Sequence, residues 1–439
     1  MRDDCDLLER ARRVMPGGVN SSLRRVDPFP VWTRAHGSHA WDASGREYID
    51  YHAAFGPPIL GYSHPGVNQQ VAEAVARLDM VGVGVTELEI RVAEKIVEHY
   101  PSAEMALLCN TGSEATYHAV RLSRAVTGRR KLLKFQGCYH GMHDYLCMNV
   151  ITPAARLGGH DPLSAGMLAE AVQNTLVVPF NDLDAVERAL ESNRGEVAAV
   201  ILETIPHNIG CVLPMAGFLE GLRELTRIHG ALLIFDEVIT GFRHHIGGYQ
   251  SICGVTPDLT TLGKAMANGW PIAAIAGRRE LMERFATCAG GDVFFAGTYN
   301  GHPAGCAAAL AVIEELEKGE VHRHIFELGE RMRRGLRSIV ASCGLTAQVA
   351  GFGSVFVTYF FEGPVRRYED LLAHDADLQI RYRRAMIDRG FFMLPMSLKR
   401  NHLSAAHTAA EVDRTLNAAE DVLGALAAGR TAAVAVDAP

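Results

Sequence analysis

The stretch Ala231-Leu-Leu-Ile-Phe-Asp-Glu-Val238 decides the fold class of this chain. Its apolar run has no polar face, which is typical of a strand in a parallel sheet covered on both sides. In an open α/β sheet, ligands bind outside the carboxyl ends of the strands. We therefore expect Asp236 and Glu237 at a ligand-binding edge, while a plain polar strand end would give the same pattern.

Apolar runs of the same kind lie on both sides of this stretch. They cover residues 105–109, 131–135, 175–178, 197–202, 258–262 and 272–276. Helical patterns lie between them, for example over 183–192 and 218–229. This alternation predicts an α/β layer architecture with a mainly parallel sheet and right-handed crossovers.

The pattern changes after about Gly301, where apolar residues recur at helical spacing around short strand-like runs at 354–361 and 391–394. The first sixty residues hold turn clusters and two short strands, at 39–42 and 47–51, which we expect to pack with the C-terminal part. The predicted division is an N-terminal segment over 1–60, a large domain over 61–320, a small α+β domain over 321–426 and a flexible tail over 427–439.

Composition excludes several classes of protein. The 439 residues are 48% apolar and 21% charged, as in an ordinary globular enzyme, and the net charge of −7 offers nothing to nucleic acid or an anionic membrane. No apolar run is long enough to span a bilayer, and residues 1–13 lack the apolar core of a signal peptide. Nine cysteines without a Cys-x-x-Cys pair favour the reducing cytoplasm.

Asp258-Leu-Thr-Thr-Leu-Gly-Lys264 places a lysine at the end of another strand. A lysine in apolar surroundings near an acid has a lowered pKa and can form an imine with an aldehyde, although a lysine after glycine is usually a solvated surface residue. A nucleotide-hydrolase interpretation would need a Walker A loop. Gly263-Lys264 is the only Gly-Lys in the chain, and Asp258 stands where that loop needs glycine.

Cys109-Asn-Thr-Gly-Ser-Glu-Ala115 joins a strand to a helix. Thr111, Gly112 and Ser113 would present hydroxyls and free N–H groups at the helix N-terminus, which suits a phosphate, although an N-cap alone explains the same residues.

Gly137-Cys-Tyr-His-Gly141 follows the strand at 131–135. Tyr139 could stack on a flat ring, or it could be a core aromatic beside a capping histidine. His140 and His143 have no evident third ligand, so we expect no metal site.

These signals are individually weak, but together they supply an imine-forming lysine, a carboxylate, a phosphate cradle and an aromatic ring at one sheet edge. Pyridoxal 5′-phosphate (PLP) requires that set.

The same motifs resemble those of the class III (subgroup II) aminotransferases, and within them most of all glutamate-1-semialdehyde 2,1-aminomutase and its relatives. The matches extend over nearly the whole chain, and the most specific are Asn110-Thr-Gly-Ser-Glu-Ala115, Gly137-Cys-Tyr-His-Gly141, Leu233-Ile-Phe-Asp-Glu-Val238, Thr240-Gly-Phe-Arg243, Asp258-Leu-Thr-Thr-Leu-Gly-Lys264, Ala296-Gly-Thr298 and Ser404-Ala-Ala-His407. The resemblance implies PLP fold type I (aspartate aminotransferase-like), with a large cofactor domain, a small α+β domain and a homodimer.

The resemblance also implies roles for single residues. Lys264 would carry the cofactor through an imine, Asp236 would pair with the ring nitrogen, and Tyr139 and Val238 would cover the two ring faces. Thr111, Gly112 and Ser113 would hold the phosphate.

The resemblance implies roles for three further residues. Thr298 would reach the phosphate of the neighbouring subunit, and Asn208 would lie near the cofactor hydroxyl. Arg24 lies where the aminomutase binds the substrate carboxylate.

The chain also departs from the aminomutase pattern. Glu203-Thr204 replaces Glu-Pro, and residues 149–160 do not match the gating loop. Lys399 stands where the aminomutase has an acid, so it would bind an anionic group of the substrate or point to solvent. We therefore expect a ping-pong aminotransferase acting on a small, carboxylate-bearing amine or amino acid and a carbonyl acceptor. The alternatives are an aminomutase and a PLP-binding protein without turnover.

Overall fold

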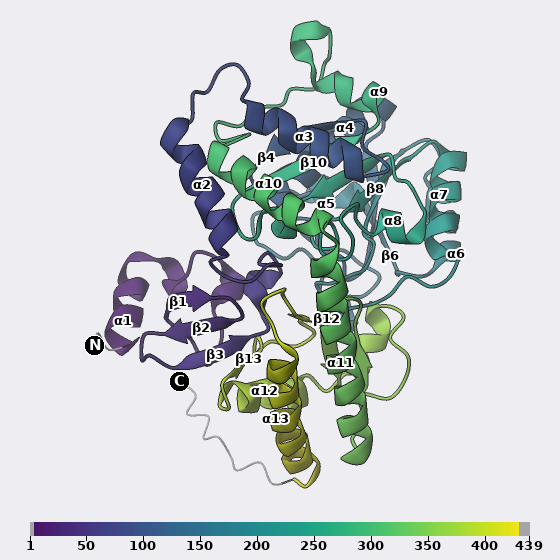
Figure 1. The fold of residues 1–439 in the computed structure, drawn as a ribbon. Helices are drawn as coiled ribbons and strands as arrows, with labels where there is room; N and C mark the ends of the chain where they lie inside the picture. The colour runs from purple at the N-terminus through teal and green to yellow at the C-terminus, as the bar shows by residue number, and fades with distance from the viewer. Residues whose placement is uncertain (1–3, 430–439) are drawn as a thin grey trace.

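A seven-stranded sheet forms the centre of the computed structural model, which describes residues 4–429 (Figure 1). Its strand order is β4-β10-β9-β8-β7-β5-β6. The strands are β4 (Met105–Cys109), β5 (Lys131–Phe135), β6 (Thr175–Val178), β7 (Val197–Glu203), β8 (Leu232–Asp236), β9 (Leu259–Leu262) and β10 (Ala273–Gly277). The sheet is mainly parallel, as predicted.

One strand is the exception, because β10 runs antiparallel to both β4 and β9. Only a short turn, η5 (Lys264–Ala267), and a few loop residues separate β9 from β10. A connection of that length cannot make the crossover that a parallel neighbour needs, so the chain must reverse direction.

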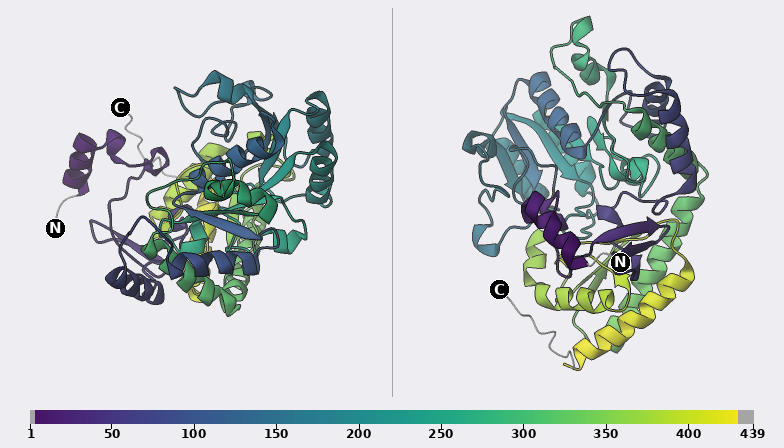
Figure 2. Two further views of the ribbon diagram at one scale, coloured as in Figure 1. Left: turned by 90° about the horizontal axis from the view of Figure 1, so that it is seen from above. Right: turned by 90° about the vertical axis from the view of Figure 1, so that its left-hand side faces the viewer.

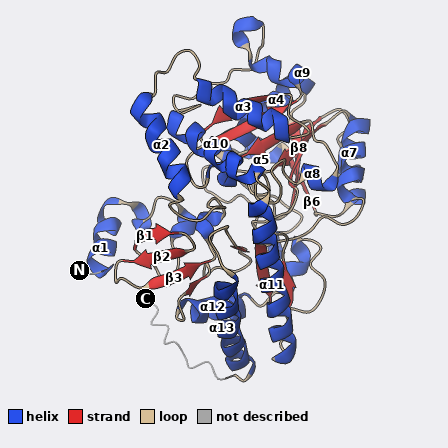
Figure 3. Ribbon diagram, viewed as in Figure 1, coloured by secondary structure: helices blue, strands red, loops and turns tan. Residues whose placement is uncertain are grey.

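Helices cover both faces of this sheet (Figures 2 and 3). Alternate residues of β5 show the division, since Leu132 packs with α4 (Gly112–Thr127), while Leu133 packs on the opposite side with α6 (Leu183–Ser192) and α7 (Phe218–His229). Elsewhere, α2 (Pro65–Arg77), α3 (Glu87–His99) and α10 (Pro303–Glu317) share one core with the ends of β4, β9 and β10. Short helices α5 (Ala169–Gln173), α8 (Gln250–Cys253) and α9 (Arg279–Met282) lie in the connections.

Two smaller sheets lie beside the large one. The first has the order β1-β2-β3-β13 and the second β11-β12-β14. Their strands are β1 (Trp32–His36), β2 (His39–Asp42), β3 (Glu47–Asp50), β11 (Gln348–Ala350), β12 (Val355–Tyr359), β13 (Phe391–Phe392) and β14 (Asn401–His402). They pack against α11 (Glu320–Ser342), α12 (Ala376–Ile387) and α13 (Ala409–Ala427). Because β3 pairs with β13, the N-terminal strands and the C-terminal region share one core.

The described part of the chain stops short of both ends. Helix α1 (Asp4–Val14) begins the described part, and residues 1–3 lie outside it. Of the predicted tail over 427–439, residues 430–439 also lie outside the described residues. Within 4–429, none of the helices has both the length and the apolar character to cross a bilayer. The cysteines described there, from Cys109 to Cys343, are free thiols.

Candidate active site

A cavity of about 260 Å³ lies at the carboxyl edge of the large sheet. Its walls come from the segments that follow β4, β5, β8 and β9, together with the end of β7. Lys264, Asp236, Tyr139, Val238 and residues 111–113 all line it. The structure therefore brings together every cofactor residue that the sequence indicated, except Asn208 and Thr298.

Lys264 occupies a constrained position in this cavity. It follows β9 at the start of η5 with a φ of 46°, in the left-handed region that a non-glycine residue adopts only when its surroundings enforce it. Burial, and then the nearby Arg400 guanidinium, lower the pKa of Lys264 to about 8, although Asp236 and Glu203 oppose that shift. Part of the lysine population is therefore uncharged near neutral pH, as a nucleophilic amine must be.

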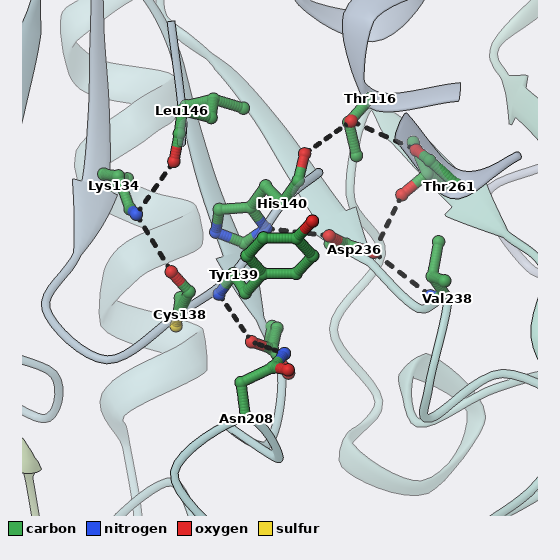
Figure 4. Close-up of polar contacts among 12 residues, drawn as sticks. Thr116, Lys134, Cys138, Tyr139, His140, Leu146, Asn208, Asp236, Val238 and Thr261 are labelled. Atoms are coloured by element: carbon green, nitrogen blue, oxygen red, sulfur yellow. Dashed lines mark hydrogen bonds and ion pairs between the residues drawn. The ribbon is translucent and has the colours of Figure 1, made fainter. Parts of the chain in front are cut away.

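Asp236 ends β8 and is almost fully buried, with an exposed fraction of 4%. Its Oδ1 accepts hydrogen bonds from the Val238 N–H and the Thr261 hydroxyl, each at 3.1 Å, and its Oδ2 lies 2.7 Å from His140 Nδ1 (Figure 4). A neutral His140 must carry its proton on Nδ1 to make that last bond, which leaves the buried Nε2 without a partner among the described residues. Asp236 Oδ2 keeps a lone pair for a further N–H donor.

The role of His140 was not evident from the sequence, which allowed only a capping histidine. His140 contacts Asp236, which is far from it in the chain, and the spacing of residues in a sequence cannot predict such a contact. The only available signal was that His140 follows a strand ending at the same edge.

The N-terminus of α4 forms an anion cradle. Thr111 is the N-cap of this 16-residue helix and completes a capping box with Glu114. A Cβ on Gly112 would lie only 2.9 Å from Val238 Cγ1, and a Cβ on Gly141 would lie 2.7 Å from Ser113 Oγ. Glycine at both positions therefore allows the helix end and the neighbouring loops to approach closely, and the first N–H groups of the helix can meet a phosphate.

Tyr139 is half-buried, and Figure 4 shows its ring in front of the His140–Asp236 pair. Its backbone N–H donates to Glu203 Oε1 at 2.8 Å. Glu203 is 2% exposed, lines the cavity and lies in register with Asp236 on the neighbouring strand. In the sequence, Glu203 stood out only as the matching half of the Glu-Thr pair that replaces Glu-Pro, although its place at the end of an apolar strand was the available signal.

Asn208 and Lys399 lie next to this carboxylate. Asn208 Nδ2 donates to Glu203 Oε1 at 2.9 Å, and Lys399 Nζ donates to the Asn208 carbonyl, also at 2.9 Å. Lys399 is only 6% exposed, so it does not point to solvent. Burial, and then Arg400, lower its pKa to about 8.

Arg24 and Thr298 lie outside this cavity. Arg24 lines a second cavity of about 470 Å³ formed by the N-terminal segment, with Phe55 and Phe392 among its other walls. The exposed Thr298 lies beside the loop over residues 79–86. Neither residue borders the cavity that contains Lys264.

The cavity residues fit PLP. A nucleophilic amine lies at Lys264, a carboxylate with a spare lone pair at Asp236, an aromatic ring at Tyr139 and an anion cradle at the start of α4. The aldehyde of PLP requires the amine, its ring nitrogen the carboxylate, its flat ring the aromatic side chain and its phosphate the anion cradle.

Comparison with known proteins gives the same class. A family model described as aminotransferase class-III matches residues 22–394. A glutamate-1-semialdehyde 2,1-aminomutase from Methanothrix thermoacetophila is 44% identical over 414 residues, which covers 94% of each protein.

Solved structures share the fold. An omega-transaminase from Sphaerobacter thermophilus superposes with a TM-score of 0.90 at 33% identity, covering 95% of this chain and 96% of that one. A transaminase with PLP bound superposes with a TM-score of 0.89 at 28% identity, covering 98% of both chains.

Proposed function

Since this chain belongs to the class-III aminotransferases and is a PLP enzyme, we propose that it moves an amino group between neighbouring carbons of one small, carboxylate-bearing substrate. The observation that carries this proposal is the 44% identity, over 94% of both proteins, with a glutamate-1-semialdehyde 2,1-aminomutase. The ping-pong aminotransferase expected from the sequence is supported only at the level of the class. The relatives favour the aminomutase that was its alternative.

Lys264 has two tasks in this proposal. Its Nζ would hold the cofactor, and the amine, once free, would move a proton at the substrate carbon that bears nitrogen. The pKa of about 8 suits both tasks, because the amine must accept and release protons near neutral pH. When bound, PLP supplies the electron sink for the bonds at that carbon.

The other cavity residues would orient the cofactor and polarise its ring. Asp236 Oδ2 would accept a hydrogen bond from the ring nitrogen, and His140 Nδ1 would keep that carboxylate in place. Tyr139 and Val238 would cover the two ring faces, while the start of α4 would bind the phosphate. Asn208, held by Glu203, would lie near the cofactor hydroxyl.

We also propose a homodimer with shared active sites. Thr298 is exposed, and large apolar side chains gather on the loops beside it, with exposed fractions of 85% for Val83, 68% for Val85, 67% for Phe294 and 63% for Tyr299. Exposed apolar clusters of this kind mark protein interfaces. Thr298 would then complete the phosphate site of the neighbouring subunit.

For the substrate we propose a carboxylate bound by Arg24 or Lys399. The Arg24 side chain makes no hydrogen bond or ion pair with the residues in the range 4–429, and the buried Lys399 ammonium donates only to a carbonyl. Both cations therefore retain capacity for an anion. We place this reaction in the cytoplasm, where free thiols such as Cys109 persist.

A second candidate is an aminotransferase with separate amino donor and acceptor. The segment over 149–160 corresponds to the gating loop of the aminomutase. Here hydrogen bonds hold its start to its end, because Asn149 Nδ2 donates to the Gly159 carbonyl at 2.8 Å and Asn149 Oδ1 accepts from the Asp161 N–H at 3.0 Å. A segment fixed in this way would not hold back an intermediate, which favours two separate substrates.

One experiment separates the candidates. The holoenzyme receives 4-amino-5-oxopentanoate (glutamate-1-semialdehyde) with no other amine or carbonyl compound, and 5-amino-4-oxopentanoate is measured by mass spectrometry. An aminomutase gives many equivalents of product per active site. An aminotransferase would instead release 4,5-dioxopentanoate and, because the substrate also carries an aldehyde, an equal amount of 4,5-diaminopentanoate. It would not build up 5-amino-4-oxopentanoate, and this outcome would overturn the proposal. Lys264→Ala is the control that should give none.

A further inference from the structure

Lys134 is the next-to-last residue of the mostly apolar strand β5, with an exposed fraction of zero. An ammonium group in such a place is costly unless its donors are satisfied, and a carboxylate is its usual partner. Here Nζ contacts no carboxylate among residues 4–429. Its three donors go instead to three backbone carbonyls.

These carbonyls come from both limbs of the loop that carries Tyr139 and His140. Lys134 Nζ donates to Cys138 O at 2.9 Å, to Leu146 O at 3.2 Å and to Met148 O, and Figure 4 shows the first two contacts to the left of Tyr139 and His140. One side chain therefore ties together the start and the end of the segment over 138–148.

The bond to Cys138 O also bears directly on Tyr139. That carbonyl and the Tyr139 N–H belong to one trans peptide group, so they point in opposite directions. Lys134 holds the carbonyl from one side, and Glu203 Oε1 accepts the N–H from the other at 2.8 Å. A cation and an anion thus polarise the same peptide, and each strengthens the bond made by the other.

The residues after this peptide have fixed positions as well. The His140 carbonyl accepts a hydrogen bond from Thr116 Oγ1 at 2.7 Å, and the His140 ring reaches Asp236 at 2.7 Å. Any shift of the clamped peptide would therefore move the Tyr139 ring and the Asp236 contact together.

We propose that Lys134 is a positioning residue of the active site, which acts with Glu203 through the Cys138–Tyr139 peptide to set the Tyr139 ring and the His140–Asp236 pair against the cofactor. This inference rests on the proposed PLP site. It assigns a task to a buried amine that forms no imine and touches no substrate.

The test compares holoenzymes of the wild type, Lys134→Met and Lys131→Met. Methionine has nearly the length of lysine but no donors. Lys131 is a matched control, since it is on the same strand but partly exposed, and it bonds to Glu196 and Asn193 at the far end. Visible absorbance and circular dichroism report the cofactor environment, and single-turnover kinetics with an amine donor report the chemistry.

Lys134→Met should still bind the cofactor covalently, as borohydride reduction would show, but its visible circular dichroism should weaken. Its single-turnover rate should fall by about 10- to 100-fold, because small misplacements of reacting groups have effects of that size. Lys131→Met should match the wild type in both. A Lys134→Met protein that loses only thermal stability, with the wild-type spectrum and rate, would overturn the inference.

Two further variants keep the test decisive. Lys134→Gln retains amide donors, so it should fold even if the methionine variant does not, and it should shift the spectrum and rate in the same direction by a smaller amount. Glu203→Gln combined with Lys134→Met should slow the reaction by less than the product of the two single effects, since both act on one peptide. Rate effects of Glu203→Gln and Lys134→Met that multiply independently, or a Lys134→Gln variant identical to the wild type, would count against the proposed role of Lys134. A wild type without a visible cofactor band would instead refute the proposed function.

Discussion

The lowered pKa of Lys264 predicts how fast the protein without cofactor captures PLP. Only the uncharged amine attacks an aldehyde. With a pKa of about 8, roughly a tenth of the Lys264 side chains are uncharged at pH 7, against about one in three thousand for a lysine of pKa 10.5. At equal intrinsic reactivity, the structure therefore predicts capture about 300-fold faster than by an ordinary lysine at that pH.

The assay mixes the protein without cofactor with PLP in a stopped-flow instrument from pH 6 to pH 10 and follows the visible band, with Nα-acetyl-lysine as the reference amine. Burial and Arg400 both disfavour the charged form, so the rate should rise about tenfold per pH unit and level off near pH 8. Arg400→Met should move the plateau to higher pH. A rate that keeps rising to pH 10, as for the reference amine, would refute the reasoning.

Three more predictions concern single residues. Asp236→Asn should lower the rate of the amine half-reaction by about 10- to 150-fold, because a charge-assisted hydrogen bond contributes roughly 1.5–3 kcal/mol, and it should affect cofactor retention less. Near-normal single-turnover rates would exclude the assigned role. Mixing Lys264→Ala subunits with Thr298→Ala subunits should restore about a quarter of the wild-type activity per subunit, because half of the dimers are mixed and each mixed dimer has one intact site. A monomer by light scattering would contradict active sites shared between subunits. Arg24→Ala or Lys399→Met should raise KM for carboxylate-bearing donors about tenfold or more with little change in kcat, and equal activity on the acids and their decarboxylated amines would count against both cations.

The sequence predicted the large sheet well because its strands are short, mostly apolar runs. The ranges for β4, β5 and β6 agree with the observed bounds to the residue, as do those for α6 and α7. The prediction of a mainly parallel sheet is confirmed, but nothing in the sequence marked β10 as its antiparallel strand, because an apolar run carries no mark of its direction. Only the short link through η5 shows that the chain must turn back.

The candidate site was predicted where a motif lies on one continuous segment. Residues 111–113 and Lys264 were found in this way, and they line one cavity. The contacts that organise the site join separate segments, as between His140 and Asp236 or between Lys399 and Asn208. Sequence reasoning could place such residues at the same sheet edge, but only the packed chain shows which atoms meet.

The pairing of β3 with β13 affects how this protein can be made. Ile49 lies beside Phe391, so a strand that leaves the ribosome early finds its partner only when translation is nearly complete. The strands from β4 to β10 are contiguous in the chain and can assemble in the meantime, whereas Ile49 and Tyr51 lack their final neighbours. Long-range pairing of this kind slows folding and prolongs the exposure of apolar surface. The nascent N-terminal strands therefore stay without their final partners through most of synthesis.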